Sequence, residues 1–258
     1  MLNPPDLPPP AAPEPDPWAA LKAFTAARIA LGRSGTSVPL RESLAFQLAH
    51  AHARDAVYSA LAVEALRTGL QVLQLATCEV QSRAQTRPEY LQRPDLGRQL
   101  AEASRARLAE LAGEACDLSI VLADGLSATA VNDHALPLLH QLLPLLKAAG
   151  FRLAPIALAE QARVALGDEI GLLLRARLVL VLIGERPGLS APNSLGAYFT
   201  YNPRPGLTDE ARNCVSNIRP AGLGYPAAAA TLFYLLHEAL RRQLSGVGLK
   251  DQSELQLG

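Results

Sequence analysis

The sequence has 258 residues, of which 49% are hydrophobic and 5% aromatic, enough for one large domain or two small ones with a sizeable core. Lys and Arg balance Asp and Glu at 24 each, which argues against nucleic acid or an acidic membrane as the main partner. Cys78, Cys116 and Cys214 match neither a zinc spacing nor a CxxC pair and favour a reducing compartment. The start shows no signal-peptide pattern, and no apolar run reaches the roughly 20 residues that span a bilayer, so we expect a soluble protein.

Residues 1–17 are rich in Pro and predict a disordered tail that packs into no core. Residues 18–112 predict a mainly helical region. Its expected elements are a long helix from about Arg41 to Arg67, an extended segment from Gly69 to Val80, and a helix that ends near Leu111.

From residue 113 to residue 258, predicted strands alternate with helices. Strands are expected at Leu118–Ala123, Phe151–Ala159, Leu178–Ile183 and Gly196–Tyr201, and helices after Ala130 and at 136–149, 167–174 and 226–244. Strands separated by helices indicate right-handed crossovers. The fold class is therefore α/β, with a Rossmann-like, mostly parallel sheet flanked by helices.

The strand ending at Ile183 carries the most informative pattern. Its apolar run is typical of a buried parallel strand and ends abruptly in Gly184-Glu-Arg-Pro-Gly188. In open α/β sheets, ligands bind at the carboxyl ends of the strands, so Glu185 and Arg186 would meet a ligand there. The alternative is an ordinary turn in which Glu185 and a nearby Arg form a surface ion pair.

Three other polar loops are expected at the same edge, namely 124–127, 162–164 and 213–218, and together they predict a ligand crevice. The chain has no GxGxxG, P-loop or GxSxG motif. His50 and His52 fall on different sides of a helix, and Cys214 has no adjacent His, so we predict neither a metal site nor a catalytic residue here. Asp168 and Glu169 are interpreted as favourable charges at a helix N-terminus.

Several segments together carry a specific resemblance, from about residue 20 to residue 250. They are Ala27-Arg-Ile-Ala-Leu-Gly-Arg33, Ala51-His-Ala-Arg-Asp-Ala56, Tyr90-Leu-Gln-Arg-Pro-Asp-Leu-Gly-Arg98, Ala123-Asp-Gly-Leu-Ser127, Arg163-Val164 with Gly167-Asp-Glu-Ile-Gly171, Gly184-Glu-Arg-Pro-Gly188 and Arg212-Asn-Cys-Val-Ser-Asn-Ile218. The chain resembles the small subunit family of ethanolamine ammonia-lyase, an adenosylcobalamin-dependent enzyme.

The resemblance implies that residues 113–258 form a cobalamin-binding domain and that Val164, Glu185 and Cys214 contact the cofactor. Ala162 departs from the Gly that relatives often have before the Arg. The chain has no Asp-x-His-x-x-Gly motif, so adenosylcobalamin is expected to keep its own benzimidazole base on cobalt.

The resemblance also implies a larger (β/α)8-barrel subunit as partner, in an oligomer of heterodimers that converts ethanolamine to acetaldehyde and ammonia by radical chemistry. We expect this assembly in the cytoplasm, within a bacterial microcompartment if the host makes one. The alternative function is a stand-alone α/β enzyme that binds another nucleotide-like ligand.

Overall fold

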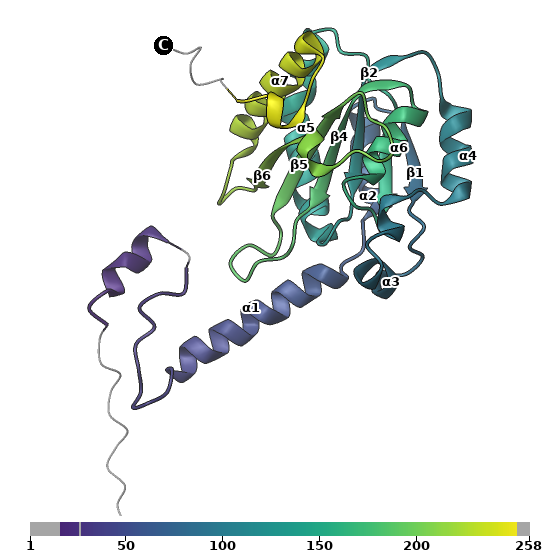
Figure 1. Ribbon diagram of the computed structural model, residues 1–258. Coiled ribbons are helices and arrows are strands. Elements are labelled where there is room, and N and C mark those ends of the chain that lie inside the picture. Colours follow the sequence, from purple (N-terminus) through teal and green to yellow (C-terminus); the bar gives the residue numbers. More distant parts are fainter. Residues whose placement is uncertain (1–15, 26, 252–258) are drawn as a thin grey trace, which may run out of the picture.

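A computed structural model describes residues 16–25 and 27–251, so the predicted Pro-rich tail lies outside the described residues except for positions 16 and 17. A six-stranded sheet forms the centre of the molecule (Figure 1), with the strand order β1-β3-β2-β4-β5-β6. Its strands are β1 (Thr77–Gln81), β2 (Cys116–Ala123), β3 (Ile156–Glu160), β4 (Ala176–Gly184), β5 (Leu195–Tyr201) and β6 (Arg212–Ile218).

The first four strands in this order run parallel, while β5 and β6 are antiparallel additions at one side. The predicted α/β fold with a mostly parallel sheet is therefore confirmed. Strand β1 pairs with β3, so residues 18–112 contribute one strand to this sheet. The division into domains at residue 112 stays a prediction.

Helices cover both faces of the sheet. They are α1 (Leu40–Tyr58), α2 (Val63–Val72), α3 (Arg87–Gln92), α4 (Glu102–Leu111), α5 (Ala128–Ala148), α6 (Leu166–Leu173) and α7 (Tyr225–Arg242), with short 3-10 turns at Ala19–Phe24, Leu96–Arg98, Asp209–Ala211 and Gly246–Gly248. Along β4, Leu180 and Leu182 pack into the core under α5 and α7, whereas Val179 and Val181 pack into the core under α6. Two buried faces explain why this strand is continuously apolar.

The predicted helix from Arg41 to Arg67 is wrong in one respect, because the chain breaks between α1 and α2. Asn132 of α5 fixes this break. Its side-chain oxygen accepts a hydrogen bond from the Ala62 amide at 2.9 Å, and its side-chain nitrogen donates to the Ala60 carbonyl at 3.0 Å. A side chain from a distant helix thus satisfies backbone groups that a continuous helix would pair internally.

The extended segment predicted from Gly69 begins too early, because α2 continues to Val72 and β1 starts only at Thr77. Gly69 lies inside α2, where a Cβ atom would come within 2.4 Å of a Leu136 methyl group on α5. Glycine at this position therefore allows α2 and α5 to pack closely, and it does not end the helix.

The two helices predicted after Ala130 and at 136–149 form one helix, α5, although it contains Pro137 and Pro144. Most apolar residues of α5 are buried against the sheet and α7, including Leu138, Leu139 and Leu142. Burying each such side chain contributes about 1.5–3 kcal/mol, which offsets the helix-breaking tendency of proline.

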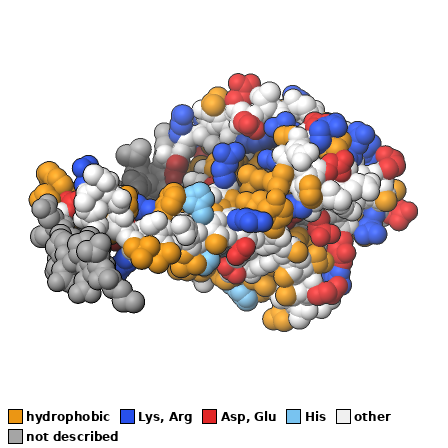
Figure 2. Space-filling view, turned by 90° about the horizontal axis from the view of Figure 1, so that it is seen from below, with side chains coloured by type: hydrophobic (Ala, Val, Ile, Leu, Met, Phe, Trp, Pro, Cys, Tyr) orange, Lys and Arg blue, Asp and Glu red, His pale blue; other side chains and the backbone are white. Residues whose placement is uncertain are grey.

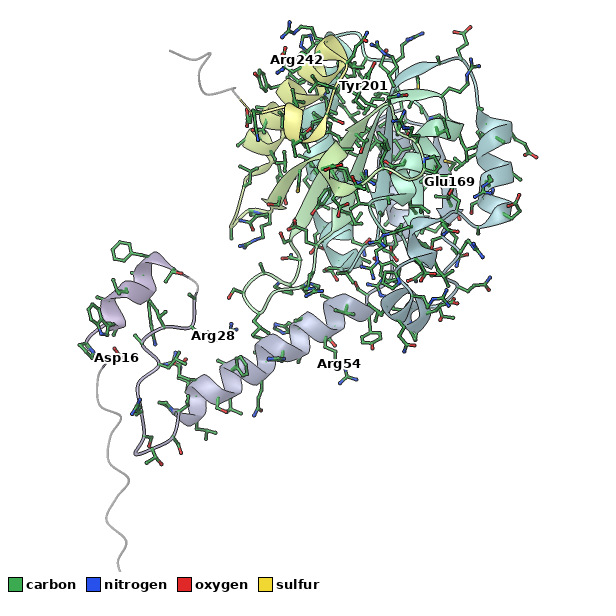
Figure 3. The ribbon with its side chains drawn as sticks, in the orientation of Figure 1. Asp16, Arg28, Arg54, Glu169, Tyr201 and Arg242 are labelled. Carbon is green, nitrogen blue, oxygen red and sulfur yellow. The ribbon has the colours of Figure 1, made fainter. Side chains whose placement is uncertain are left out.

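Helix α1 and the segment before it form an arm that extends away from the sheet (Figures 1 and 2). Arg28, labelled in Figure 3, joins this arm to the β4–β5 loop, because its Nη2 donates to the Leu189 carbonyl at 3.1 Å. Of the fourteen exposed large hydrophobic residues in the described part of the chain, nine lie between Trp18 and Tyr58. Within the described ranges, no helix has the length and apolar character needed to cross a membrane.

Candidate functional site

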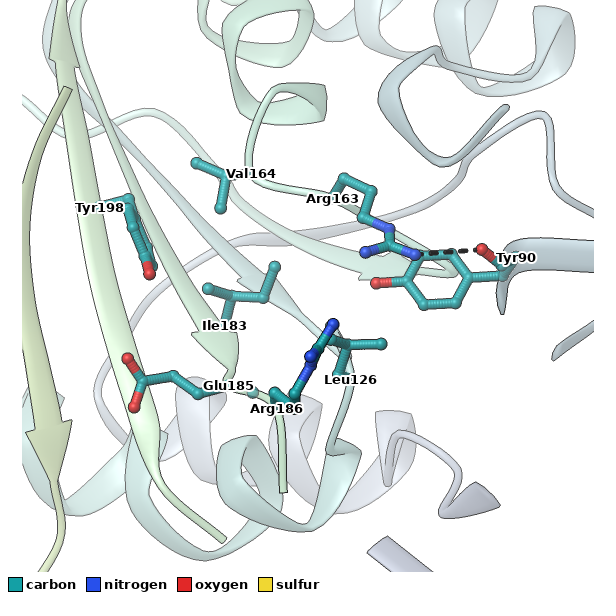
Figure 4. Close-up of a pocket in the computed structure, with 10 residues that line it drawn as sticks. Tyr90, Leu126, Arg163, Val164, Ile183, Glu185, Arg186 and Tyr198 are labelled. Atoms are coloured by element: carbon teal, nitrogen blue, oxygen red, sulfur yellow. Dashed lines mark hydrogen bonds between the residues drawn. The ribbon is translucent and has the colours of Figure 1, made fainter. Parts of the chain in front are cut away.

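Loops after three parallel strands form a pocket of about 430 Å³ (Figure 4). The loops follow β2, β3 and β4, whose carboxyl ends share one edge of the sheet. The pocket is lined by Tyr90, Gly125, Leu126, Arg163, Val164, Ile183, Gly184, Glu185, Arg186 and Tyr198. The expected gathering of loops 124–127, 162–164 and 184–188 is confirmed.

Asp124 ties two of these loops together. Its carboxylate accepts hydrogen bonds from the backbone amides of Gln161 at 2.8 Å and Ala162 at 2.9 Å. Burial raises the pKa of Asp124 to about 6, and the Arg87 guanidinium 3.6 Å away opposes this rise. The loop after β2 thereby fixes the segment that carries Arg163 and Val164.

The loops after β2 and β4 approach each other through glycines. The Leu126 amide donates to the Gly184 carbonyl at 2.9 Å. Gly125 has a φ of +58°, and a Cβ atom there would lie 2.3 Å from the Gly184 oxygen. Only glycine combines this backbone conformation with so close a contact, so both loops are held rigidly at the pocket.

Tyr90 lies between two guanidinium groups at one side of the pocket. The Arg87 and Arg163 guanidinium carbons are 4.7 Å and 4.3 Å from the centre of its ring, within the range of cation–π contacts. The Tyr90 hydroxyl donates to the Ala162 carbonyl at 3.1 Å, and burial raises its pKa to about 12. Arg163 Nη2 in turn donates to the Tyr90 carbonyl at 3.2 Å.

Glu185 forms hydrogen bonds rather than the ion pair of the alternative interpretation. Its Oε2 accepts from the Ser194 hydroxyl at 2.5 Å and from the Asn217 amide at 3.4 Å. No Lys, Arg or His in the described part of the chain forms a salt bridge with it. The surface-pair interpretation is therefore wrong, and the carboxylate is oriented by its own β4–β5 hairpin and by β6.

Cys214 lines a second, adjoining pocket of about 240 Å³ with Val164, Tyr198, Asp209 and Arg212. It lies on β6 directly opposite Tyr198 of β5. Desolvation raises the pKa of the Cys214 thiol, and the hydrogen bond with Tyr198 opposes this rise, so the thiol stays protonated at neutral pH. Such a thiol can donate a weak hydrogen bond but is a poor nucleophile.

The three residues predicted to contact a ligand thus surround two adjoining pockets. Val164 and Tyr198 line both pockets, Glu185 lines the first and Cys214 the second. The segment 213–218, expected as a loop, is part of the antiparallel strand β6. Its polar residues reach the site because β6 pairs with β5 next to β4.

Sequence patterns do not predict two aromatic residues of the site. Tyr90 lies on α3, far in sequence from the loops it packs against, and Tyr198 lies inside an ordinary-looking strand. The only local signal is that Tyr90 opens one of the segments that carry the resemblance. The pocket offers guanidinium groups on one side of Ile183 and the Glu185 carboxylate on the other (Figure 4). The Cys214 thiol lines the adjoining pocket.

Comparison with known proteins adds an independent finding. The family described as ethanolamine ammonia-lyase light chain matches residues 15–250. The ethanolamine ammonia-lyase small subunit of Azotobacter vinelandii is 57% identical over 243 residues, which are 93% of this chain and 90% of that protein. The small subunit of Ralstonia nicotianae is 56% identical over 245 residues, covering 94% of this chain and 91% of the relative.

The corresponding subunit of Pseudomonas aeruginosa is 55% identical over 244 residues, with 93% of this chain and 89% of the relative covered. The match extends through the arm, the sheet and every loop of the two pockets. The chain belongs to the small (light) subunit family of ethanolamine ammonia-lyase, a lyase built from two kinds of subunit.

Proposed function

We propose that this chain clamps adenosylcobalamin against the large subunit of ethanolamine ammonia-lyase, with Val164, Glu185 and Cys214 in contact with the cofactor. The observation that carries the proposal is their placement around two adjoining pockets at the carboxyl edge of the sheet. Ligands of open α/β sheets bind at this edge.

The residues present fit a corrin with amide side chains. Glu185 can accept hydrogen bonds from amide N–H groups, the Cys214 thiol can donate to amide carbonyls, and Val164 offers an apolar contact. Arg163 Nε is buried and has no hydrogen-bond partner among the described residues. When bound, adenosylcobalamin supplies the radical chemistry that converts ethanolamine to acetaldehyde and ammonia.

This chain's own residues bind and orient the cofactor and keep water from one side of it. A pocket of about 430 Å³ is smaller than cobalamin, so the remaining surface of the cofactor needs another cover. We assign that cover, and the groups that bind ethanolamine, to a large subunit with a (β/α)8 barrel.

The arm supports a partner of this kind. Its exposed apolar residues include Trp18, Phe24 and Leu40, with 65%, 86% and 74% of their surface accessible. Large apolar side chains clustered on one projecting segment are typical of a surface that another protein covers. The multi-copy assembly of heterodimers belongs to the same proposal.

Reconstitution tests the proposed function. The chain, the large subunit and adenosylcobalamin are mixed, and acetaldehyde formation from ethanolamine is measured with each component omitted in turn. We expect turnover only when all three are present. Turnover by the large subunit and cofactor alone would contradict the clamping role, and turnover of another substrate by this chain alone would favour a stand-alone α/β enzyme.

A further inference from the structure

Two arginines reach into the larger pocket from different loops. Arg163 follows β3 and Arg186 follows β4, and Figure 4 shows both guanidinium groups directed toward the part of the pocket beside Leu126. Neither forms an ion pair with any carboxylate in residues 16–25 and 27–251. Two uncompensated positive charges in one pocket favour an anion.

The nearest acidic residues of the site are already engaged. Glu185 accepts hydrogen bonds from Ser194 and the Asn217 amide, and Figure 4 shows it on the far side of Ile183. Asp124 is buried, accepts two backbone amides and lies 3.6 Å from Arg87. Neither carboxylate neutralises the two pocket arginines, so the compensating charge has to come from a bound group.

Arg163 is held in place before any ligand arrives. It stacks on Tyr90 at 4.3 Å, and Nη2 donates to the Tyr90 carbonyl, while Nε remains without a partner. Arg186 is exposed and has no such restraint. A fixed guanidinium together with an exposed one is suited to binding a phosphate, whose oxygens accept paired N–H groups from arginine.

We infer that Arg163 and Arg186 bind the phosphodiester in the nucleotide tail of cobalamin. This inference rests on the proposed function. The amide side chains of the corrin are uncharged, and the phosphodiester is the anionic group at the periphery of the cofactor. The pocket then orients cobalamin, with the nucleotide tail beside the arginines and the corrin amides beside Glu185 and Cys214.

Cobinamide, which lacks the nucleotide tail and its phosphodiester, provides the test. Equilibrium dialysis measures the binding of cyanocobalamin and of cobinamide to the reconstituted two-subunit complex. Arg186→Gln is the main variant, because an exposed side chain is dispensable for folding. Arg204→Gln is the matched control, since Arg204 is exposed beyond the end of β5 at the opposite edge of the sheet.

We expect Arg186→Gln to weaken cyanocobalamin binding about tenfold and to leave cobinamide binding unchanged. The Arg204→Gln control should bind both ligands as tightly as the wild type. Added salt should weaken cyanocobalamin binding less in Arg186→Gln than in the wild type. Equal losses for both ligands, no loss for either, or equal salt effects would overturn the inference. A loss of subunit association instead would assign the arginines to a carboxylate of the partner.

The test separates this inference from the proposed function. If the wild-type complex binds no cyanocobalamin, the proposed function fails and the phosphate assignment fails with it. If the wild-type complex binds cyanocobalamin and Arg186→Gln binds it equally well, only the assignment of the arginines is overturned.

Discussion

Asp168 of α6 and Arg212 of β6 form a buried ion pair, with 2.7 Å between Asp168 Oδ2 and Arg212 Nη2. Only 2% and 3% of the two side chains are accessible. Helix α6 follows the loop that carries Val164, and β6 carries Cys214, so the pair joins the two sides of the smaller pocket. Asp168 was expected only to favour the helix N-terminus, and the structure gives it this long-range partner.

Removing one member of this pair leaves a buried charge without its partner. Arg212→Met is therefore expected to lower the free energy of unfolding by about 3–5 kcal/mol, measured by urea denaturation followed by circular dichroism. Arg241→Met is the control, because the Arg241–Glu238 pair is on the surface and its loss should leave the unfolding midpoint unchanged. Equal midpoints for both variants would show that the buried pair contributes nothing to stability.

Asp124 predicts a pH dependence of stability. Its pKa of about 6 in the folded chain exceeds the value of about 3.9 expected when unfolded. The folded chain keeps the Asp124 carboxyl protonated up to a higher pH than the unfolded chain does. The contribution of Asp124 to the free energy of unfolding is therefore present below about pH 4 and is lost as the pH rises through about 6.

Asp124→Asn cannot titrate at this position. The stability advantage of the wild type over this variant should shrink by about 2 kcal/mol between about pH 4.5 and about pH 7. Urea denaturation of both proteins at the two pH values measures the difference. An advantage that stays constant or grows toward neutral pH would show that the carboxylate is ionised throughout.

Glu185 is predicted to hold the cofactor through its carboxylate. Glu185→Gln keeps the shape and should weaken adenosylcobalamin binding modestly, while Glu185→Ala should weaken it about tenfold or more. The fold should survive, because Glu185 lies in a loop. Glu160→Ala is the matched control, since this exposed carboxylate ends β3 outside the lining of both pockets. An unchanged dissociation constant for Glu185→Ala, measured by titration of the complex, would remove Glu185 from the site.

Arg87 connects the arm to the larger pocket. Its Nε donates to the Val57 carbonyl at the end of α1 at 2.6 Å, and its Nη1 donates to the Gly125 carbonyl at 2.8 Å. Arg87→Met should accelerate amide hydrogen exchange both in the last turn of α1 and in residues 125–127. Arg83→Met, which alters an exposed neighbour, should change neither region. Faster exchange in only one of the two regions would show that Arg87 does not couple them.

The sequence predicts the central strands well because both faces of β2 and β4 are buried, which makes most of their residues apolar. It fails where distant residues decide the local structure. Asn132 breaks the helix expected across Ser59, and packing keeps α5 helical through Pro137. Strand β6 resembles a loop because its buried residues Arg212, Val215 and Ile218 recur at every third position, without the alternation typical of a strand.

For the site, the polar loops after β2, β3 and β4 could be predicted, since parallel strands bring their carboxyl ends to one edge. The hydrogen bond from Ser194 to Glu185 and the stacking of Tyr90 on Arg163 could not. Both contacts depend on how side chains from separate segments are oriented, and no periodic pattern in the sequence reports that orientation.

This chain is proposed to supply part of the cobalamin site. The most direct test is equilibrium dialysis of adenosylcobalamin against the large subunit alone, this chain alone and the reconstituted complex. We expect the complex to bind the cofactor at least tenfold more tightly than either subunit alone. Equal affinity of the large subunit with and without this chain would contradict it.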